Sequence, residues 1–211
     1  MEHILLHWMG DERGNKIPEG VNILPIAIPI GTQPLHAAGI AWALKYQKKN
    51  AGAVTFFGDG ATSEGDVHEA MNFASALKLP VVFFCQNNFW AISVPRESQT
   101  GSETIAQKGL AYGMPSCQID GNDIFASYKT VRDALKTAVG ENQPVFIEAI
   151  TYRLGDHTTA DDARRYRDQA LVDKWAKKDP LIRTRKYLES KKLWNDKKQA
   201  ELEARAKEIV D

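Results

Sequence analysis

The stretch that decides the fold is Val54-Thr55-Phe56-Phe57-Gly58-Asp59-Gly60, together with its counterpart Val81-Val82-Phe83-Phe84-Cys85-Gln86-Asn87-Asn88. Each begins as a continuous apolar run and ends in glycine, aspartate or asparagine. Continuous apolar runs are typical of strands that are buried on both faces of a parallel sheet. Residues 66–78, between the two runs, carry apolar side chains at helical spacing. The pair therefore predicts a strand–helix–strand unit.

Asp59 and Asn88 each follow one of these strands. Because the carboxyl ends of parallel strands lie at one edge of a sheet, where ligands bind in open α/β folds, we expect the two side chains to meet there. Carboxylate and amide oxygens are ligands for a hard cation, and the glycines leave backbone N–H groups open to a phosphate. The sequence thus predicts a cation site facing a phosphate-bearing ligand. A dinucleotide-binding motif is the competing interpretation, but Ser63 stands where its third glycine is required.

The same patterns predict the rest of the sheet and its helices. A third apolar strand is expected over 145–152 and a short strand over 117–119. Strands that alternate with helices favour a parallel sheet with right-handed crossovers, so the expected fold is an α/β doubly wound sheet. The predicted helices are a short one at 1–8, one from an N-cap at Thr32 to about residue 48, one closed by Gly113, and one from an N-cap at Asp123 to about residue 139.

The ends of the chain differ from this core. Residues 21–31 are apolar but broken by two prolines, which predicts an extended wall rather than a central strand. Residues 153–167 are polar and lack periodicity, so we expect a mobile loop there. Charged amphipathic helices are expected at 168–178, 181–193 and 197–210. The predicted division is an α/β domain over 1–167 and a C-terminal helical tail over 168–211.

The composition excludes several classes of protein. The 211 residues include 27 Lys+Arg and 27 Asp+Glu, so the net charge of zero gives no reason to expect nucleic acid or an anionic membrane as a partner. Cys85 and Cys117 match no disulfide framework or zinc spacing. Apolar stretches are too short to span a membrane. We expect a cytoplasmic location, or the mitochondrial matrix in a eukaryote.

Several motifs resemble those of a known family. The spacing of Gly58-Asp59-Gly60 and Asn87-Asn88, with 26 residues between them, resembles the thiamine diphosphate binding motif. Nearly the whole chain is similar to the alpha subunit of 2-oxo acid dehydrogenases, the pyruvate-specific members first and the branched-chain members next. The matching stretches are Gly31-x-Gln33, Gly58 to Asp66, Glu69-Ala70-x-Asn72, Gln86-Asn87-Asn88-x-Trp90-Ala91-Ile92-Ser93, Asp120-Gly121-Asn122-Asp123 and Thr151-Tyr152-Arg153-x-Gly155-x-His157-Thr158-Thr159-x-Asp161-Asp162.

The resemblance implies thiamine diphosphate held through Mg²⁺. Because the expected site has no Lys or Arg cluster, the metal must neutralise much of the diphosphate charge. Mg²⁺ prefers near-octahedral oxygen ligands, and we expect three from the protein: the carboxylate of Asp59, the amide oxygen of Asn88 and the backbone carbonyl of Trp90. Gly60 and Ala61 are expected to donate backbone N–H groups to the diphosphate.

Three further roles are implied by the resemblance alone. Ile28 and Ile30 correspond to positions whose backbone touches the cofactor beneath its aminopyrimidine ring, although two core aliphatic residues are the alternative interpretation. His157 corresponds to a catalytic histidine on a mobile loop, near the diphosphate and the path of acyl transfer. Tyr166-Arg167 corresponds to a pair that helps order the closed site, with a plain surface role as its alternative.

The implied activity is oxidative decarboxylation of pyruvate, with transfer of the acyl unit to lipoyl groups on an acyltransferase core. In the family, a beta subunit completes the site within a heterotetramer, and a substantial N-terminal segment precedes the part matched here. We therefore expect this chain alone to be inactive and to self-associate through uncovered apolar faces. The alternatives are a branched-chain 2-oxo acid dehydrogenase alpha subunit, a transketolase-like half and a non-catalytic truncated assembly module.

Overall fold

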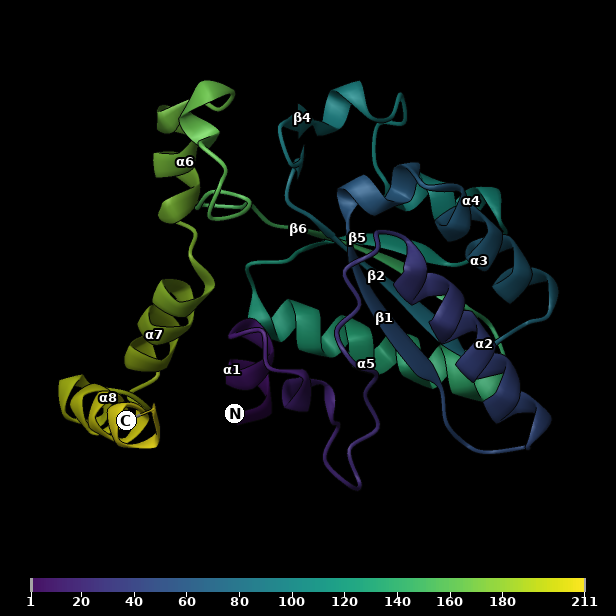
Figure 1. Ribbon diagram of the computed structural model, residues 1–211, viewed down its shortest axis with the longest axis horizontal. Helices are drawn as coiled ribbons and strands as arrows, with labels where there is room; N and C mark the ends of the chain where they lie inside the picture. Colours follow the sequence, from purple (N-terminus) through teal and green to yellow (C-terminus); the bar gives the residue numbers. More distant parts are fainter. Residues whose placement is uncertain (1, 211) are drawn as a thin grey trace.

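A computed structural model describes residues 2–210, whose centre is a four-stranded parallel sheet (Figure 1). The strands lie in the order β1 (Ala53–Gly58), β2 (Val81–Asn87), β6 (Val145–Ile150) and β5 (Ser116–Asp120). All three pairings are parallel. Helices cover both faces of the sheet, so the predicted α/β doubly wound fold is confirmed.

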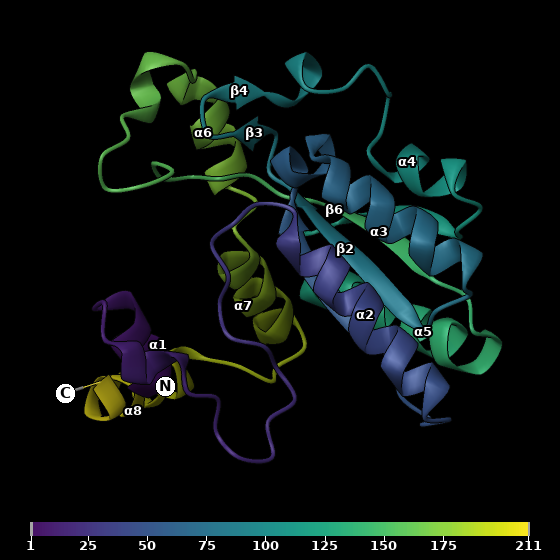
Figure 2. The ribbon, with the colours of Figure 1, turned by 45° about the vertical axis from the view of Figure 1, so that its right-hand side comes forward.

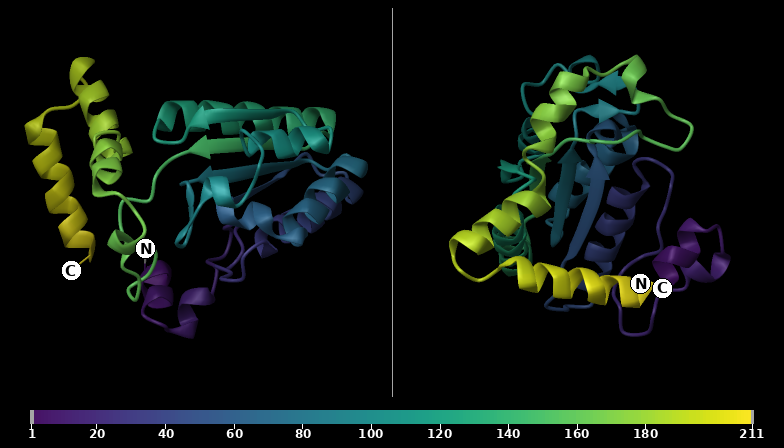
Figure 3. Two further views of the ribbon diagram at one scale, coloured as in Figure 1. Left: turned by 90° about the horizontal axis from the view of Figure 1, so that it is seen from above. Right: turned by 90° about the vertical axis from the view of Figure 1, so that its left-hand side faces the viewer.

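The order of the strands explains why the sheet is covered on both faces. The chain moves from β1 to β2 through α3 (Gly65–Ala76), and it returns from the edge strand β5 to β6 through α5 (Ile124–Glu141). Right-handed crossovers in opposite directions put their helices on opposite faces. Seen from above in Figure 3, α5 lies on one side of the sheet, and α2 (Thr32–Tyr46) lies with α3 on the other.

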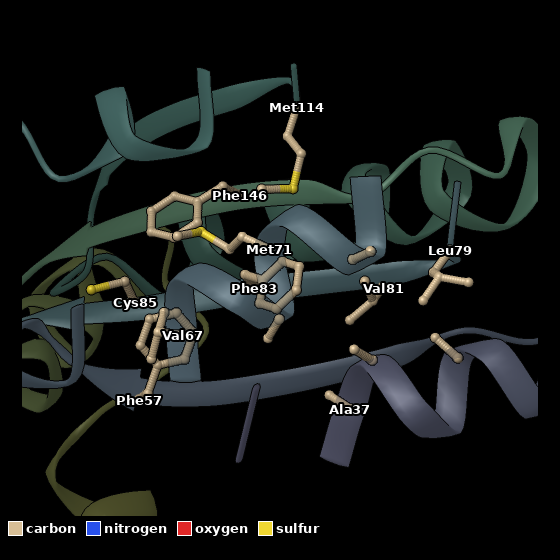
Figure 4. Close-up of a cluster of buried hydrophobic side chains, with 14 of the residues drawn as sticks. Ala37, Phe57, Val67, Met71, Leu79, Val81, Phe83, Cys85, Met114 and Phe146 are labelled. Carbon is tan, nitrogen blue, oxygen red and sulfur yellow. The ribbon is translucent and has the colours of Figure 1, made fainter. Parts of the chain in front are cut away.

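The core consists of two layers that share the sheet. On the face of α2 and α3, Phe83 and Phe146 are fully buried against Met71 (Figure 4). On the face of α5, Val82 and Ile147 are fully buried in a second cluster. Side chains alternate between the two faces of a strand, so β2 supplies residues to both layers. This burial on both faces confirms the prediction made from its continuous apolar run.

Some element boundaries differ from the prediction. The N-cap of α2 is Gly31, with a φ of +83°, and Thr32 is the first helical residue, so the predicted N-cap at Thr32 is wrong. Asp123 caps α5 as predicted, with its side chain accepting from the N–H groups of Phe125 and Ala126. The 3₁₀ helix η2 (Asp59–Ser63) follows β1 directly. A small hairpin of β3 (Trp90–Ala91) and β4 (Val94–Pro95) was not predicted.

The remaining elements lie outside the sheet. Figure 2 shows α6, α7 and α8 following one another beside it. Their sequential placement agrees with the expected C-terminal helices, but the division of the chain at residue 167 stays a prediction. Within residues 2–210, no helix is long and apolar enough to cross a membrane. The further elements are α1 (Glu2–Trp8), η1 (Glu12–Asn15), η3 (Arg96–Ser98), α4 (Ala106–Ala111), η4 (Ala163–Arg165), α6 (Gln169–Ala176), α7 (Pro180–Ser190) and α8 (Asp196–Val210).

The packing of α4 on the sheet yields a stability prediction. A Cβ atom added at Gly109 would lie 2.7 Å from the Cβ of Phe146, whereas one added at Gly140 in α5 meets nothing within 4 Å. We expect Gly109→Ala to destabilise the chain by about 1–3 kcal/mol through overpacking. The matched change Gly140→Ala should stabilise it by up to about 1 kcal/mol, because glycine weakens a helix. Denaturant unfolding of both variants is the measurement, and equal midpoints would contradict the packing argument.

Candidate functional site

Asp59 lies at the carboxyl edge of the sheet, where the sequence predicted it. It is the first residue of η2, directly after β1, and only 2% of its surface is exposed. The register of β1 and β2 pairs Gly58 with Gln86, which places Asp59 level with the end of β2. There the backbone N–H of Asn88 donates to Asp59 Oδ1 at 3.2 Å. The structure therefore brings the two predicted residues into contact.

The Asp59 carboxylate is buried and has no ion-pair partner among residues 2–210. Its second oxygen accepts a long hydrogen bond, 3.3 Å, from the Nε2 atom of Gln99. Burial raises the pKa of Asp59, and hydrogen bonding to Asn88 opposes that rise. Because a buried charge is unfavourable unless it is paired or binds a metal, this carboxylate fits a cation ligand.

Two further oxygens beside Asp59 have capacity left for a cation. The side-chain oxygen of Asn88 accepts from the N–H of Trp90 at 3.0 Å, and an amide oxygen has two lone pairs. Trp90 is paired across the hairpin with Pro95. Proline has no N–H, so Pro95 cannot hydrogen-bond to the Trp90 carbonyl. The geometry thus agrees with the predicted metal ligands, whose role stays a prediction.

The hairpin packs closely on η2 at Gly60. A Cβ added at Gly60 would lie 2.8 Å from the Cβ of Ala91 and 3.6 Å from the Oε1 atom of Gln99. Only glycine therefore lets the hairpin approach this closely. Ala61 follows at 5% exposure. The N–H groups of Gly60 and Ala61 lie in the first turn of η2, where no preceding turn supplies acceptors, which is compatible with the predicted diphosphate contact.

A network that sequence reasoning missed holds the other end of η2. The Thr62 carbonyl accepts from Lys108 Nζ at 2.7 Å and contacts His68 Nε2 at 3.1 Å. Because a carbonyl only accepts, His68 donates from Nε2, and its Nδ1 lies 2.8 Å from the Tyr112 hydroxyl. Burial lowers the pKa of Lys108. His68 thus helps to hold the loop that carries Asp59.

Glu148 was also missed. It lies in the apolar strand β6, is fully buried, and accepts a hydrogen bond of 2.7 Å from the side chain of Asn87. The available signal was a single charged residue inside an otherwise apolar strand run. Lys, Glu, Arg and Asp are almost never fully buried unless they are paired, so such a residue predicts a polar network.

His157 lies on the loop after β6 and is exposed. Its backbone N–H donates to Asp161 Oδ2 at 2.8 Å, and the Tyr166 hydroxyl donates to the same oxygen at 2.5 Å. The His157 ring lies 3.5 Å from a guanidinium nitrogen of Arg153. Arg153 in turn donates to the carbonyl of Ile92 in the hairpin at 2.7 Å. The loop is thereby joined to the Asp59 site, while the catalytic role of His157 stays a prediction.

Arg153 is a further charged group of the site to which the sequence analysis assigned no role. Its charge lowers the pKa of Asp59 and opposes the effect of burial, so the guanidinium lies within electrostatic reach of that carboxylate. Its Nε atom is buried and has no hydrogen-bond partner among residues 2–210. A buried N–H without an acceptor is unfavourable, and an anionic group such as a diphosphate would satisfy it. The residues present therefore fit the predicted cofactor.

Tyr166-Arg167 takes part in these contacts. The Tyr166 ring lies 5.3 Å from the Trp90 ring, and Arg167 donates to the carbonyls of Arg153, Leu154 and Gly155. The pair thus binds the loop to itself and to the hairpin. Its proposed effect on a closed site stays a prediction.

Ile28 and Ile30 are exposed at 69% and 62%, so the alternative interpretation as core residues is wrong. Gln33 donates to the carbonyl of Ala27 at 2.7 Å and holds the segment against the start of α2. A Cβ added at Gly31 would lie 3.1 Å from the Cβ of Glu64, which immediately follows η2. The segment therefore ends beside the Asp59 loop, and its contact with a cofactor ring stays a prediction.

No group of three His, Cys, Asp or Glu residues that suits a metal occurs within residues 2–210. The predicted ligand set is of a different kind. It combines one carboxylate with one amide oxygen and one backbone carbonyl, as hard cations such as Mg²⁺ accept.

Comparisons with known proteins agree with these observations. The family model described as "Dehydrogenase E1 component" matches residues 1–211. The chain is 51% identical over 199 residues to the pyruvate dehydrogenase E1 component subunit alpha of Staphylococcus aureus (strain Mu50), covering 94% of this chain and 54% of that protein. It is 47% identical over 207 residues to the 3-methyl-2-oxobutanoate dehydrogenase subunit alpha of Mycobacterium tuberculosis (strain H37Rv), covering 98% and 56%. The chain thus spans about half the length of these relatives.

The contacts of Asp161 predict how the loop responds to a charge change. Hydrogen bonds from Tyr166 and His157 lower the pKa of Asp161 from its ordinary value of 3.8. Its contribution to loop order is therefore complete above that value and is lost as the pH falls through the lower folded-state pKa. Asp161→Asn removes the charge at neutral pH, so we expect faster limited proteolysis within residues 153–167.

The control is Asp133→Asn on the exposed side of α5, where Lys129 and Arg132 likewise lower the pKa of the carboxyl. This variant should leave cleavage of the loop unchanged. Equal cleavage rates for wild type and Asp161→Asn would show that the Asp161 contacts do not order the loop.

Proposed function

We propose that this chain, which belongs to the dehydrogenase E1 component family, forms the diphosphate-binding part of the alpha subunit of a 2-oxo acid dehydrogenase. The observation that carries the proposal is the buried Asp59 carboxylate, which contacts Asn88 and has no ion-pair partner among residues 2–210. Beside it stand a carbonyl at Trp90 that its hairpin partner cannot use and an orphaned donor on Arg153. Together these groups suit Mg²⁺ and a diphosphate.

In this proposal, Asp59, Asn88 and the Trp90 carbonyl would hold Mg²⁺, which would neutralise part of the diphosphate charge. Gly60 and Ala61 donate backbone N–H groups to the diphosphate. Arg153 adds a positive charge at the same place. When bound, thiamine diphosphate supplies the nucleophilic carbon and the electron sink for decarboxylation, while the protein supplies position and electrostatics.

His157 acts on the substrate side of the site in this proposal. Its neighbours Asp161, Tyr166 and Arg153 hold the loop on the hairpin, which supports a closed arrangement that excludes water. A histidine here would hold or donate a proton while the acyl unit passes to a lipoyl group. Ile28 and Ile30 would support the cofactor ring from the segment that ends beside η2.

Partner subunits form part of the proposal. The relatives are named as alpha subunits, which supports a beta subunit as partner. Ile28, Ile30, Trp8 and Met9 expose large apolar side chains, at 69%, 62%, 70% and 81%. Such surfaces are typical of protein interfaces. If no partner subunit covers these side chains, the isolated chain would self-associate through them. A lipoyl-bearing acyltransferase core is the proposed acceptor, in the cytoplasm or the mitochondrial matrix.

Pyruvate is the proposed substrate, and a branched-chain 2-oxo acid is the second candidate. The second candidate is favoured by the 47% identity to the mycobacterial 3-methyl-2-oxobutanoate dehydrogenase subunit. No contact among the described residues discriminates the two side chains. A non-catalytic assembly module is the alternative from another class, and cofactor binding separates it from both enzymes.

Asp59→Ala is the direct test of the metal site. We expect it to abolish Mg²⁺-dependent binding of thiamine diphosphate by the chain in its native assembly. Loss of a group that merely supports a metal ligand typically costs roughly 10–100-fold in metal affinity, so loss of the ligand itself should cost at least as much. Isothermal titration calorimetry provides the measurement. The control is Asp196→Ala, whose side chain is 97% exposed, and unchanged affinity in Asp59→Ala would refute the assignment.

The substrate is tested by steady-state release of carbon dioxide. We expect turnover of pyruvate by the chain assembled with its beta subunit and supplied with the family's N-terminal segment, and none by the chain alone, because electrostatic stabilisation weakens where water is not excluded. A larger kcat/KM with 3-methyl-2-oxobutanoate would assign the branched-chain activity instead. Robust turnover by the isolated chain would contradict the need for a partner.

A further inference from the structure

Glu148 is a fully buried carboxylate at the centre of the sheet that none of the roles above uses. Its Oε1 atom accepts from Asn87 Nδ2 at 2.7 Å. Its Oε2 atom accepts from the backbone N–H of Ala106 at 2.9 Å and from Gln118 Nε2 at 3.1 Å. Since all three partners are donors, Glu148 serves purely as an acceptor.

The three donors come from three different elements. Asn87 ends β2, Ala106 begins α4, and Gln118 lies in the neighbouring strand β5. Charge-assisted hydrogen bonds of this kind are about twice as strong as neutral ones. Glu148 therefore ties the end of β2, which leads into the predicted metal site, to the elements behind it.

The contact with Asn87 determines which way that amide faces. Because Glu148 only accepts, the Asn87 nitrogen must point toward it, which leaves the amide oxygen for the turn that follows. That oxygen accepts from the N–H of Phe89 at 3.0 Å. Phe89 has a φ of +69°, a conformation that is unfavourable for a bulky residue and needs such support.

The turn at Phe89 carries the predicted metal ligands on either side of it. Asn88 precedes Phe89 and contacts Asp59, and Trp90 follows it and donates its N–H to the Asn88 side chain. A chain of hydrogen bonds thus runs from Glu148 through Asn87 to the backbone that presents the Asn88 and Trp90 oxygens. A change at Glu148 alters the orientation of both oxygens without touching the metal.

We propose that Glu148 is a positioning residue for the metal site, acting through the side chain of Asn87. The inference rests on the proposed function, because it concerns the same Mg²⁺ site. Glu148→Gln keeps the shape but replaces one acceptor by a donor, which then faces an N–H group. The Asn87 amide is no longer forced into one orientation, and the Phe89 turn loses its defined acceptor.

The test measures Mg²⁺ affinity by calorimetry in the presence of thiamine diphosphate, on the full chain in its native assembly. We expect Glu148→Gln to weaken Mg²⁺ binding by about 10–100-fold, the range typical for groups that orient metal ligands. Gln118→Ala is the matched control, since it removes another partner of Glu148 but leaves the Asn87 contact. It should lower the melting temperature while leaving Mg²⁺ affinity unchanged, a split that a purely structural role of Glu148 does not produce.

A double-mutant cycle tests the route through Asn87. If Glu148 acts through this side chain, Asn87→Ala and the double variant Asn87→Ala with Glu148→Gln bind Mg²⁺ equally weakly, because interacting residues are non-additive. Additive losses would overturn the route. Asn87→Ala also serves as the test where Glu148→Gln fails to fold, since unchanged Mg²⁺ affinity in it would overturn the inference.

The outcomes for wild type separate this inference from the proposed function. Wild-type protein that binds no Mg²⁺ with thiamine diphosphate would contradict the proposed function, and the inference with it. Wild-type binding together with unchanged affinity in Glu148→Gln would overturn the positioning role alone.

Discussion

The parallel pairing of β1 with β2 is the constraint on which the site depends. Two strands that run in the same direction deliver their carboxyl ends to one edge, and the register puts Asp59 beside Asn88 there. Because β2 is buried along both faces, a shift of its register would move whole sets of apolar side chains. The packing of the hydrophobic core therefore determines the contact between Asp59 and Asn88, although neither residue belongs to that core.

The surroundings of Asp59 contain strained backbone and unpaired polar groups that a bound ligand would stabilise. The carboxylate is buried with a raised pKa, the hairpin beside it contains Phe89 and Ile92 at positive φ, and Arg153 keeps a buried donor without a partner. Strained backbone and unpaired polar groups cluster at functional sites and persist only where the structure around them enforces them. Here Glu148, Lys108 and the hairpin packing on Gly60 supply that enforcement.

The features that could be predicted from the sequence are those whose signal lies within a short stretch of the chain. The strand β2 was predicted because burial on both faces leaves a continuous apolar run, and Asp123 because a cap needs only its own turn. The same pattern predicted β1, but burial on both of its faces was wrong, because β1 is an edge strand and Phe56 is 55% exposed. The hairpin has two residues in each strand, too few for any periodicity. The role of Glu148 depends on its contacts with Asn87, Ala106 and Gln118. These residues come from other parts of the chain, so the sequence near Glu148 does not show them.

A crystal structure of the chain in its native assembly, with thiamine diphosphate and Mg²⁺, would show which oxygens bind the metal. We expect an octahedral ion about 2.0–2.1 Å from oxygens of Asp59, Asn88 and the Trp90 carbonyl, with Gln99 displaced from the Asp59 Oδ2 atom that it now contacts. A cofactor bound with its metal on other oxygens, or an Asp59 that keeps its contact with Gln99 while the cofactor lies elsewhere, would contradict this expectation.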